Sequence, residues 1–304
     1  MIDLRRQGAE RTSDVAFLDC LEALNSLEIL SLRYGLDSAW SLASFLGIAK
    51  HRSLKELKLP VIPLPWLREL DNDRDGGFFT NVEEFNACLS DHGLELVLPH
   101  LAKITKLETN IIGPSTHALR IAATAPALRS LTLAFDANSV IHERDLILFA
   151  ETHSALESLD LGSEDLDDIP SADDITDTTI DQVARLLPKL KFLEIYLADT
   201  ALTETSLLSL GTFCKCLDTC SISGDFFFEG LVRNCQHNLF PALGSLRLMQ
   251  SVSDRRQYTD PEETARQFVK IAPNLTHLDF DLENSTEGDT ALEGAVYELT
   301  RAAR

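Results

Sequence analysis

The sequence has little positive charge. Its 304 residues include 27 Lys and Arg against 48 Asp and Glu, which gives a formal net charge of −21 at pH 7. Binding nucleic acid through phosphates requires clustered Lys and Arg, and anionic membrane surfaces attract the same residues. The composition therefore argues against a nucleic-acid partner and against a membrane surface. It is compatible with a protein partner that carries a basic patch.

Long apolar runs are missing as well. No segment approaches the roughly 20 apolar residues of a membrane-spanning helix. The first residues, MIDLRRQGAERTSD, do not contain the apolar run of a signal peptide. Together with cysteines that suggest no disulfide framework, this favours a reducing compartment, the cytosol or the nucleus.

Motifs for catalysis and metal binding are also lacking. There is no glycine-rich phosphate loop and no nucleophile elbow, so we expect no enzyme activity and no cofactor. Asp71, Asp73, Asp75 and Gly76 resemble the opening of a calcium loop, but the twelfth position, which should be a bidentate Glu, holds Val82. We therefore expect no metal site here.

What the sequence does contain is a repeat. The pattern Leu-x-x-Leu-x-apolar returns nine times, mostly at intervals of about 24 to 34 residues. Each copy is typical of a short strand with alternate residues facing inward, and stacked copies bury what one strand cannot bury alone. The copies begin at Leu27, Leu54, Ile104, Leu128, Leu156, Leu190, Leu217, Leu243 and Leu275.

A helix is expected before most of these strands. Ile180, Val183, Ala184 and Leu187 have the i, i+3, i+4, i+7 spacing of an apolar helix stripe, and three other repeats place apolar or small residues at the same offsets. Strand and helix alternating at this period predict an α/β fold. It is a curved right-handed solenoid with a parallel sheet on the concave face and helices on the convex face.

The repeat also explains residues that would otherwise suggest chemistry. Cys214 and Cys220, two of three closely spaced cysteines, fall at core positions of the repeat, and their spacing is not that of paired zinc ligands. His51 and His153 occupy the same offset as Cys214 and Leu187, three residues before a strand leucine. We therefore interpret Cys214, Cys220, His51 and His153 as structural residues.

The whole chain, 1–304, is predicted to be one domain. We expect an N-terminal cap over 1–23, about nine repeats over 24–283, and a C-terminal capping helix over 289–304.

Two repeats are longer than the others, with insertions expected near 60–100 and 162–178. The first could be an inserted excursion or could contain a degenerate repeat. The second is acidic. It could supply helix caps from a solvated loop, or it could be a docking site for a basic partner.

The pattern resembles the leucine-rich repeats of ribonuclease-inhibitor type, and within them the degenerate repeats of fungal F-box proteins, over roughly 24–283. Many leucine-rich repeats have Asn or Cys three places after the third apolar residue. Neither occurs at that position here, so uneven turns are expected. The resemblance implies a substrate-recruiting subunit of a ubiquitin ligase, although no F-box that would bind the ligase adaptor is visible. Rival interpretations are a regulator of a small GTPase, as in the Ran GTPase-activating proteins, and an enzyme with residues on an inserted loop.

A partner would contact the outward positions of the strands. Most of these positions hold small or charged residues, whereas Phe192 and Tyr196 are aromatic, as interface anchors often are. We also consider that they pack locally under a neighbouring loop. The candidate partner-binding residues are Asp160, Phe192, Glu194, Tyr196, Ser221, Arg247 and Asp279.

The first prediction concerns calcium. Because Val82 stands where the loop needs a chelating Glu, calorimetric titration should show no calcium binding tighter than about millimolar. A micromolar heat signal that the Asp71→Ala substitution abolishes would contradict this expectation.

Overall fold

The computed structural model describes residues 2–3, 14–32, 40–72, 77–136, 138–163, 169–235, 238–250, 260–280 and 287–302. Within these ranges, 11 strands form one sheet whose spatial order follows the sequence, and every neighbouring pair is parallel. The strands are β1 (Ile2–Asp3), β2 (Ile29–Ser31), β3 (Glu56–Val61), β4 (Glu84–Leu89), β5 (Lys106–Ile111), β6 (Ser130–Ala134), β7 (Ser158–Gly162), β8 (Phe192–Ile195), β9 (Thr219–Gly224), β10 (Ser245–Gln250) and β11 (His277–Phe280).

Helices alternate with the strands. They are α1 (Asp14–Ala23), α2 (Leu42–Ala49), α3 (Leu64–Asn72), α4 (Asp91–Val97) with the short 3₁₀ turn η1 (Leu98–His100), α5 (Ala118–Ala122), α6 (Glu143–Thr152), α7 (Asp177–Leu186), α8 (Glu204–Phe213), α9 (Phe228–Asn234), α10 (Pro261–Ile271) and α11 (Glu287–Ala302). None of the described helices has the length and apolar character needed to cross a membrane.

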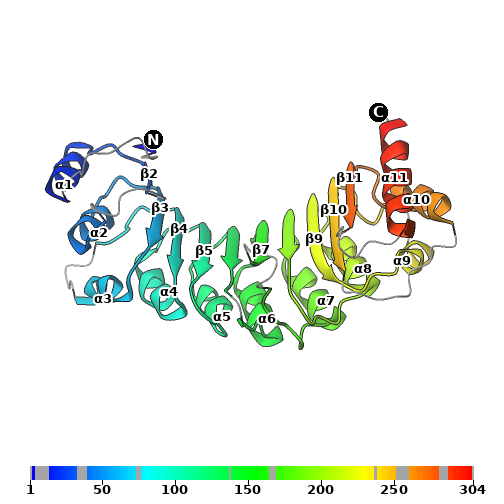
Figure 1. Cartoon of the computed structure of the whole chain (residues 1–304), viewed down its shortest axis with the longest axis horizontal. Coiled ribbons are helices and arrows are strands. Elements are labelled where there is room, and N and C mark those ends of the chain that lie inside the picture. The colour runs from blue at the N-terminus through cyan, green and yellow to red at the C-terminus, as the bar shows by residue number, and fades with distance from the viewer. Residues whose placement is uncertain are drawn as a thin grey trace.

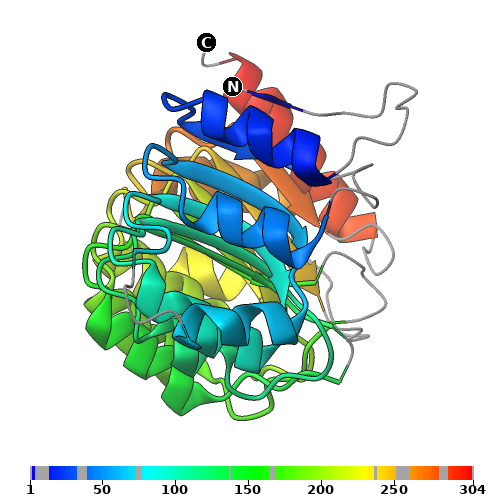
Figure 2. The same cartoon turned by 90° about the vertical axis from the view of Figure 1, so that its left-hand side faces the viewer.

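The elements form an arc with the sheet along its inner face and the helices along its outer face, and the two termini lie at opposite ends (Figure 1). Seen from the end, the strands follow one another as successive rungs, with helices stacked beside them (Figure 2). The fold is a leucine-rich-repeat solenoid, as the sequence predicts.

Strand register follows the repeat. Leu131 pairs with Leu159, Leu159 with Leu193, and Leu193 with Cys220. These side chains are buried, and residues on either side of them point to the concave face. The predicted parallel sheet is confirmed, and the six repeats that begin at Leu128, Leu156, Leu190, Leu217, Leu243 and Leu275 are consecutive neighbours in it, from β6 to β11.

The stretch 60–100 is a degenerate repeat, not an insertion. Its strand β4 pairs with β3 and β5 in the common register. Val82, Phe85 and Ala87 take the three apolar places of the pattern and are each 1% exposed. The departure from leucine at all three places conceals this repeat in the sequence. Positions 73–76 of the suspected calcium loop lie outside the described residues.

The expected N-terminal cap also contains a strand. The two residues of β1 pair in parallel with β2, and helix α1 follows, with Phe17 and Leu21 buried against the core. At the other end α11 occupies the place of the expected capping helix, with Leu292 and Val296 buried.

The acidic stretch near 162–178 supplies helix caps, although its positions 164–168 lie outside the described residues. Thr176 and Thr179 form a capping box at the start of α7. Asp177 reaches the next repeat. Its Oδ1 accepts hydrogen bonds from the backbone N–H groups of Thr203 (2.8 Å) and Ser206 (3.1 Å), and its Oδ2 accepts one from the Thr203 hydroxyl (2.6 Å). One carboxylate thus caps the N-terminus of α8.

The histidines and cysteine at one shared offset connect successive repeats. His51 Nε2 lies 3.2 Å from the carbonyl oxygen of Leu24, and His153 Nε2 lies 3.1 Å from that of Ala125. The Cys214 thiol donates to backbone carbonyls of the preceding repeat, the nearer at 3.5 Å. Burial raises the pKa of the Cys214 thiol to about 12. These contacts support the structural interpretation of all three residues.

The second prediction concerns the cap between repeats. Replacing Asp177 with Ala leaves the α8 amides without their charged acceptor, so the free energy of unfolding should fall by about 2–3 kcal/mol in urea denaturation. Asp173→Ala, an exposed change in the same acidic stretch, should stay within about 0.5 kcal/mol. Equal effects of the two substitutions would contradict the capping role.

Candidate partner-binding surface

The register brings one outward residue from each of seven strands into a line across the concave face. We call this line the central row. Neighbours along it are Cα partners, about 4.8 Å apart from strand to strand. From β5 to β11 the row consists of Glu108, Thr132, Asp160, Glu194, Ser221, Arg247 and Asp279.

Away from the middle of the concave face, three carboxylates have cations beside them. On β3 the Lys58 ammonium lies 2.8 Å from Glu56 Oε1. Lys106 Nζ lies 3.6 Å from Glu84 Oε2. At the other end Arg247 Nε donates to Asp279 Oδ2 at 2.8 Å. Ion pairs within the chain therefore neutralise these carboxylates on both sides of the middle of the concave face.

The middle of the face is different. Strands β6 to β9, which are described throughout, contain no Lys or Arg. Asp160 and Glu194 are Cα partners on β7 and β8, and among the described residues neither forms an ion pair. Two carboxyl groups thus lie side by side on a sheet surface, and no residue in the described part of the chain supplies a counter-ion.

This arrangement changes the acidity of Asp160. Burial raises the pKa of Asp160 to about 6, and the nearby Glu194 and Glu108 carboxylates act in the same direction. A hydrogen bond from the Thr132 hydroxyl opposes the shift only partly. Removal from water and a like charge both disfavour the ionised form of a carboxyl group. At neutral pH the group is therefore ionised at an energetic cost that a bound cation would relieve.

Phe192 is the first residue of β8 and Tyr196 directly follows its last residue, with Glu194 midway between them in the sequence. The sequence suggested two exposed aromatics, but both side chains are half-buried. For Tyr196 the cause is Gly162: a Cβ placed on Gly162 would lie 3.1 Å from the Tyr196 Cβ. The missing side chain on β7 lets Tyr196 lie close against that strand, at the residue two positions after Asp160.

Ser221 follows Glu194 in the central row, and its side chain alternates with the core residues Cys220 and Ile222. It is only 4% exposed, yet its hydroxyl has no hydrogen-bond partner among the described residues. An unsatisfied buried hydroxyl is uncommon in native proteins, because it costs about 1–3 kcal/mol. A donor or acceptor supplied from outside would satisfy it.

Five of the predicted site residues are therefore brought together. Asp160, Phe192, Glu194 and Ser221 lie on three adjacent strands, and Tyr196 directly follows β8. Arg247 and Asp279 belong to the same row, but they pair with each other at its end.

Sequence reasoning did not select Thr132, Glu108 or Gly162 for the site. Alignment of the fifth position across repeats would have placed Thr132 and Glu108 in the row. The contact of Gly162 with Tyr196 joins two strands, and no local sequence pattern announces it.

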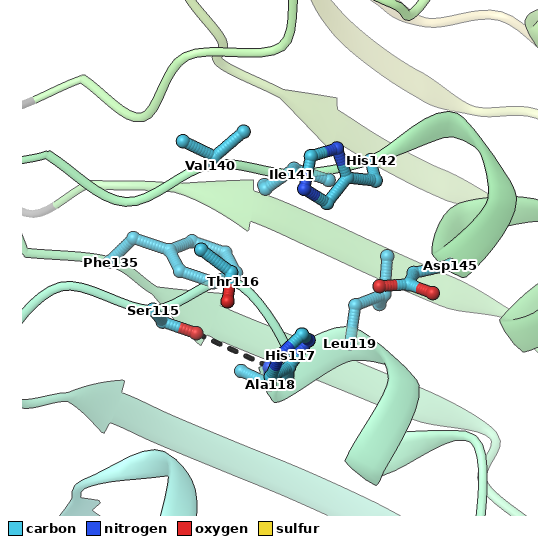
Figure 3. Close-up of a pocket in the computed structure, with 10 residues that line it drawn as sticks. All are labelled: Ser115, Thr116, His117, Ala118, Leu119, Phe135, Val140, Ile141, His142 and Asp145. Atoms are coloured by element: carbon cyan, nitrogen blue, oxygen red, sulfur yellow. Dashed lines mark hydrogen bonds between the residues drawn. The ribbon is translucent and has the colours of Figure 1, made fainter.

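A second feature is a hollow between the starts of α5 and α6, where His117 and His142 lie on either side (Figure 3). Asp145 is 4% exposed there, and its Oδ2 has no hydrogen-bond partner among the described residues. The enclosed space is about 10 Å³, far below the roughly 300–1,000 Å³ of ligand pockets. No group of three or more metal-ligating side chains occurs in the described part of the chain.

The third prediction concerns Asp160 and pH. Its pKa is higher in the folded chain than in the unfolded one, so stability is fully present below about pH 4 and is lost as the pH rises through about 6. Asp160→Asn cannot ionise, so it avoids this loss of stability. Its amide oxygen can still accept the hydrogen bond from the Thr132 hydroxyl. The variant should gain about 1–2 kcal/mol in unfolding free energy near pH 8, allowing for partial exposure.

Urea denaturation at several pH values measures this difference. The gain should shrink steadily toward pH 4. A variant that is less stable than the wild type near pH 8 would show that the Asp160 carboxylate is compensated in the folded chain.

Comparisons with known proteins support the architecture. No protein-family model matches the chain, and no curated protein sequence matches it. Among solved structures the chain is similar to Rad7 in the Rad7–Elc1 complex of yeast, with 14% sequence identity, a TM-score of 0.51, and coverage of 89% of this chain and 76% of that chain. At this identity the similarity shows the fold alone.

A second solved structure, actin-binding site 2 of leiomodin-1, is 16% identical and covers 63% of this chain and 95% of that chain. Its TM-score of 0.33 is too low to carry an argument. The chain thus shares its leucine-rich-repeat architecture with a yeast protein that is held in a complex with another protein.

Proposed function

We propose that this chain is a non-enzymatic protein-interaction module whose partner binds the middle of the concave face. The observation that carries the proposal is the pair Asp160 and Glu194, which has no counter-ion among the described residues and is flanked by Phe192 in β8 and by Tyr196 just after it. Aromatic side chains are frequent interface anchors, and neighbouring carboxylates favour a partner with a basic patch.

Exposed acidic surface also promotes encounter with such a partner. The formal net charge of −21 attracts a basic protein over several ångströms, while the aromatics supply short-range contact once it has arrived. The described cysteines form no disulfide, in line with our proposal that the module works in the cytoplasm or the nucleus.

A finer version of the proposal is substrate recruitment for a ubiquitin ligase. The similarity to fungal F-box repeat proteins motivates it, and Rad7, whose fold this chain shares, occurs in a complex with Elc1. In that version the concave face takes the substrate, and a ligase adaptor binds elsewhere. Support for it is weaker than for the interaction module, because it depends on resemblance and not on a contact within this chain.

The fourth prediction tests the surface. The purified chain serves as bait for partners in extracts of its source organism, and the affinity of a captured, purified protein is then measured by calorimetry. Replacing both Phe192 and Tyr196 with Ala should weaken that affinity by about 2 kcal/mol or more, because truncated anchors leave the partner's pocket empty. Raised salt should slow association with a basic partner.

A matched aromatic pair provides the control. Phe227 and Tyr297 are 41% and 57% exposed on other parts of the molecule, and replacing both with Ala should leave the affinity within about twofold. The half-burial of Phe192 and Tyr196 means that their double substitution should also cost roughly 2 kcal/mol of stability, so measurements are made well below its melting temperature. Equal loss of affinity in both double variants would contradict binding at the concave face.

A further inference from the structure

We propose that Asp160, Glu194 and Ser221 form a site for a single lysine ammonium group of the partner. The proposal rests on the function proposed above and adds the chemistry of recognition. The three residues come from β7, β8 and β9 and are consecutive members of the central row.

The charge distribution points to this place. Glu56, Glu84 and Asp279 on the same face each have a Lys or Arg of this chain within 4 Å. Asp160 and Glu194 have none among the described residues, although they are adjacent. A cation supplied by a partner would give the middle of the face the ion pairing that its ends already have.

Ser221 is the independent observation. Its buried hydroxyl is aimed to the same face as Glu194 and lacks a partner among the described residues. An ammonium group has three donors, and this site presents two carboxylates and one hydroxyl oxygen as acceptors. One bound ammonium therefore satisfies the orphaned hydroxyl and both carboxylates. A guanidinium, in contrast, favours a planar fork on a single carboxylate.

The surroundings also suit the aliphatic stem of lysine. Phe192 precedes Glu194 by two residues on the same face of β8, and Tyr196 follows it by two. The four methylenes of a lysine side chain can lie along such rings while the ammonium reaches the acids. Gly162, two residues after Asp160 on β7, lets Tyr196 approach that strand closely.

Binding at this site must be coupled to protons. Besides Thr132, the groups facing Asp160 are the carboxylates Glu108 and Glu194, and the pKa of Asp160 is about 6. An ammonium group binds the ionised form, so binding releases a proton from any molecule in which Asp160 is protonated. With a pKa of about 6, affinity should fall about tenfold from pH 8 to pH 5.

The experiment uses the full chain and a fluorescent hexalysine peptide, blocked at both ends, with binding followed by anisotropy at about 0.15 M salt. Wild type should bind saturably at pH 8, and a peptide with every lysine acetylated should not bind. The variants Asp160→Asn and Glu194→Gln keep the shape of each side chain, so they preserve packing. Together they should weaken binding at least tenfold.

Glu151→Gln is the control for overall charge, because Glu151 is exposed on α6, away from the sheet. It removes one negative charge, as each site substitution does, and should change the affinity by less than twofold. Asp160→Asn alone should abolish the tenfold dependence on pH between 5 and 8. Ser221→Ala should weaken binding of lysine peptide by a few fold without altering that dependence.

Three results would overturn the inference. They are no binding of hexalysine to the wild type, equal weakening by Glu151→Gln and by the site substitutions, and a pH dependence that survives in Asp160→Asn. Any of these together with a partner that still requires Phe192 and Tyr196 would leave the interaction module standing and remove only the lysine site. A partner whose binding ignores the aromatics would instead remove the proposed function.

Discussion

The fixed register between parallel neighbours is the constraint on which the rest of this molecule depends. Each strand places Leu or an equivalent at the same level, from Leu131 through Leu159 to Leu193, and the core is continuous only while that level is kept. A shift by one residue would turn every apolar side chain to the solvent. The same register lines up the outward residues, so the central row is a consequence of how the core is built.

Backbone hydrogen bonds between parallel strands hold this register, and side-chain hydrogen bonds that differ from repeat to repeat support it. In one repeat the Asp177 carboxylate caps the next helix, in others a histidine or the Cys214 thiol meets a backbone carbonyl of the repeat before. These side chains have similar roles, because each forms hydrogen bonds with backbone N–H or C=O groups at or just beyond a helix end. Different side chains can therefore make equivalent contacts between repeats, which explains how repeats of uneven sequence still stack into a regular solenoid.

The middle of the concave face is less favourable for the isolated chain than it could be. A half-buried Asp160 next to Glu194 costs stability, and so does the buried Ser221 hydroxyl, which has no partner among the residues that the structure describes. Other carboxylates on the face are paired with cations. Proteins commonly accept such local cost where activity or binding requires it. Because these unfavourable groups are adjacent and lie near two aromatic side chains, contact with a single partner could offset the cost of all of them.

The sequence by itself determined the fold class, the identity of the core residues, and which strand positions face outward, because these follow from a period that each repeat carries locally. It also indicated that His153 and Cys214 are structural. It did not disclose the repeat around Phe85, where none of the three apolar places holds leucine. Only the tertiary structure decided that no cation from the described residues pairs with Asp160, that Tyr196 lies against Gly162, and that Ser221 is buried. These properties arise between strands separated by about 27 residues or more, where neighbours across the sheet, and not neighbours in the chain, set burial and charge.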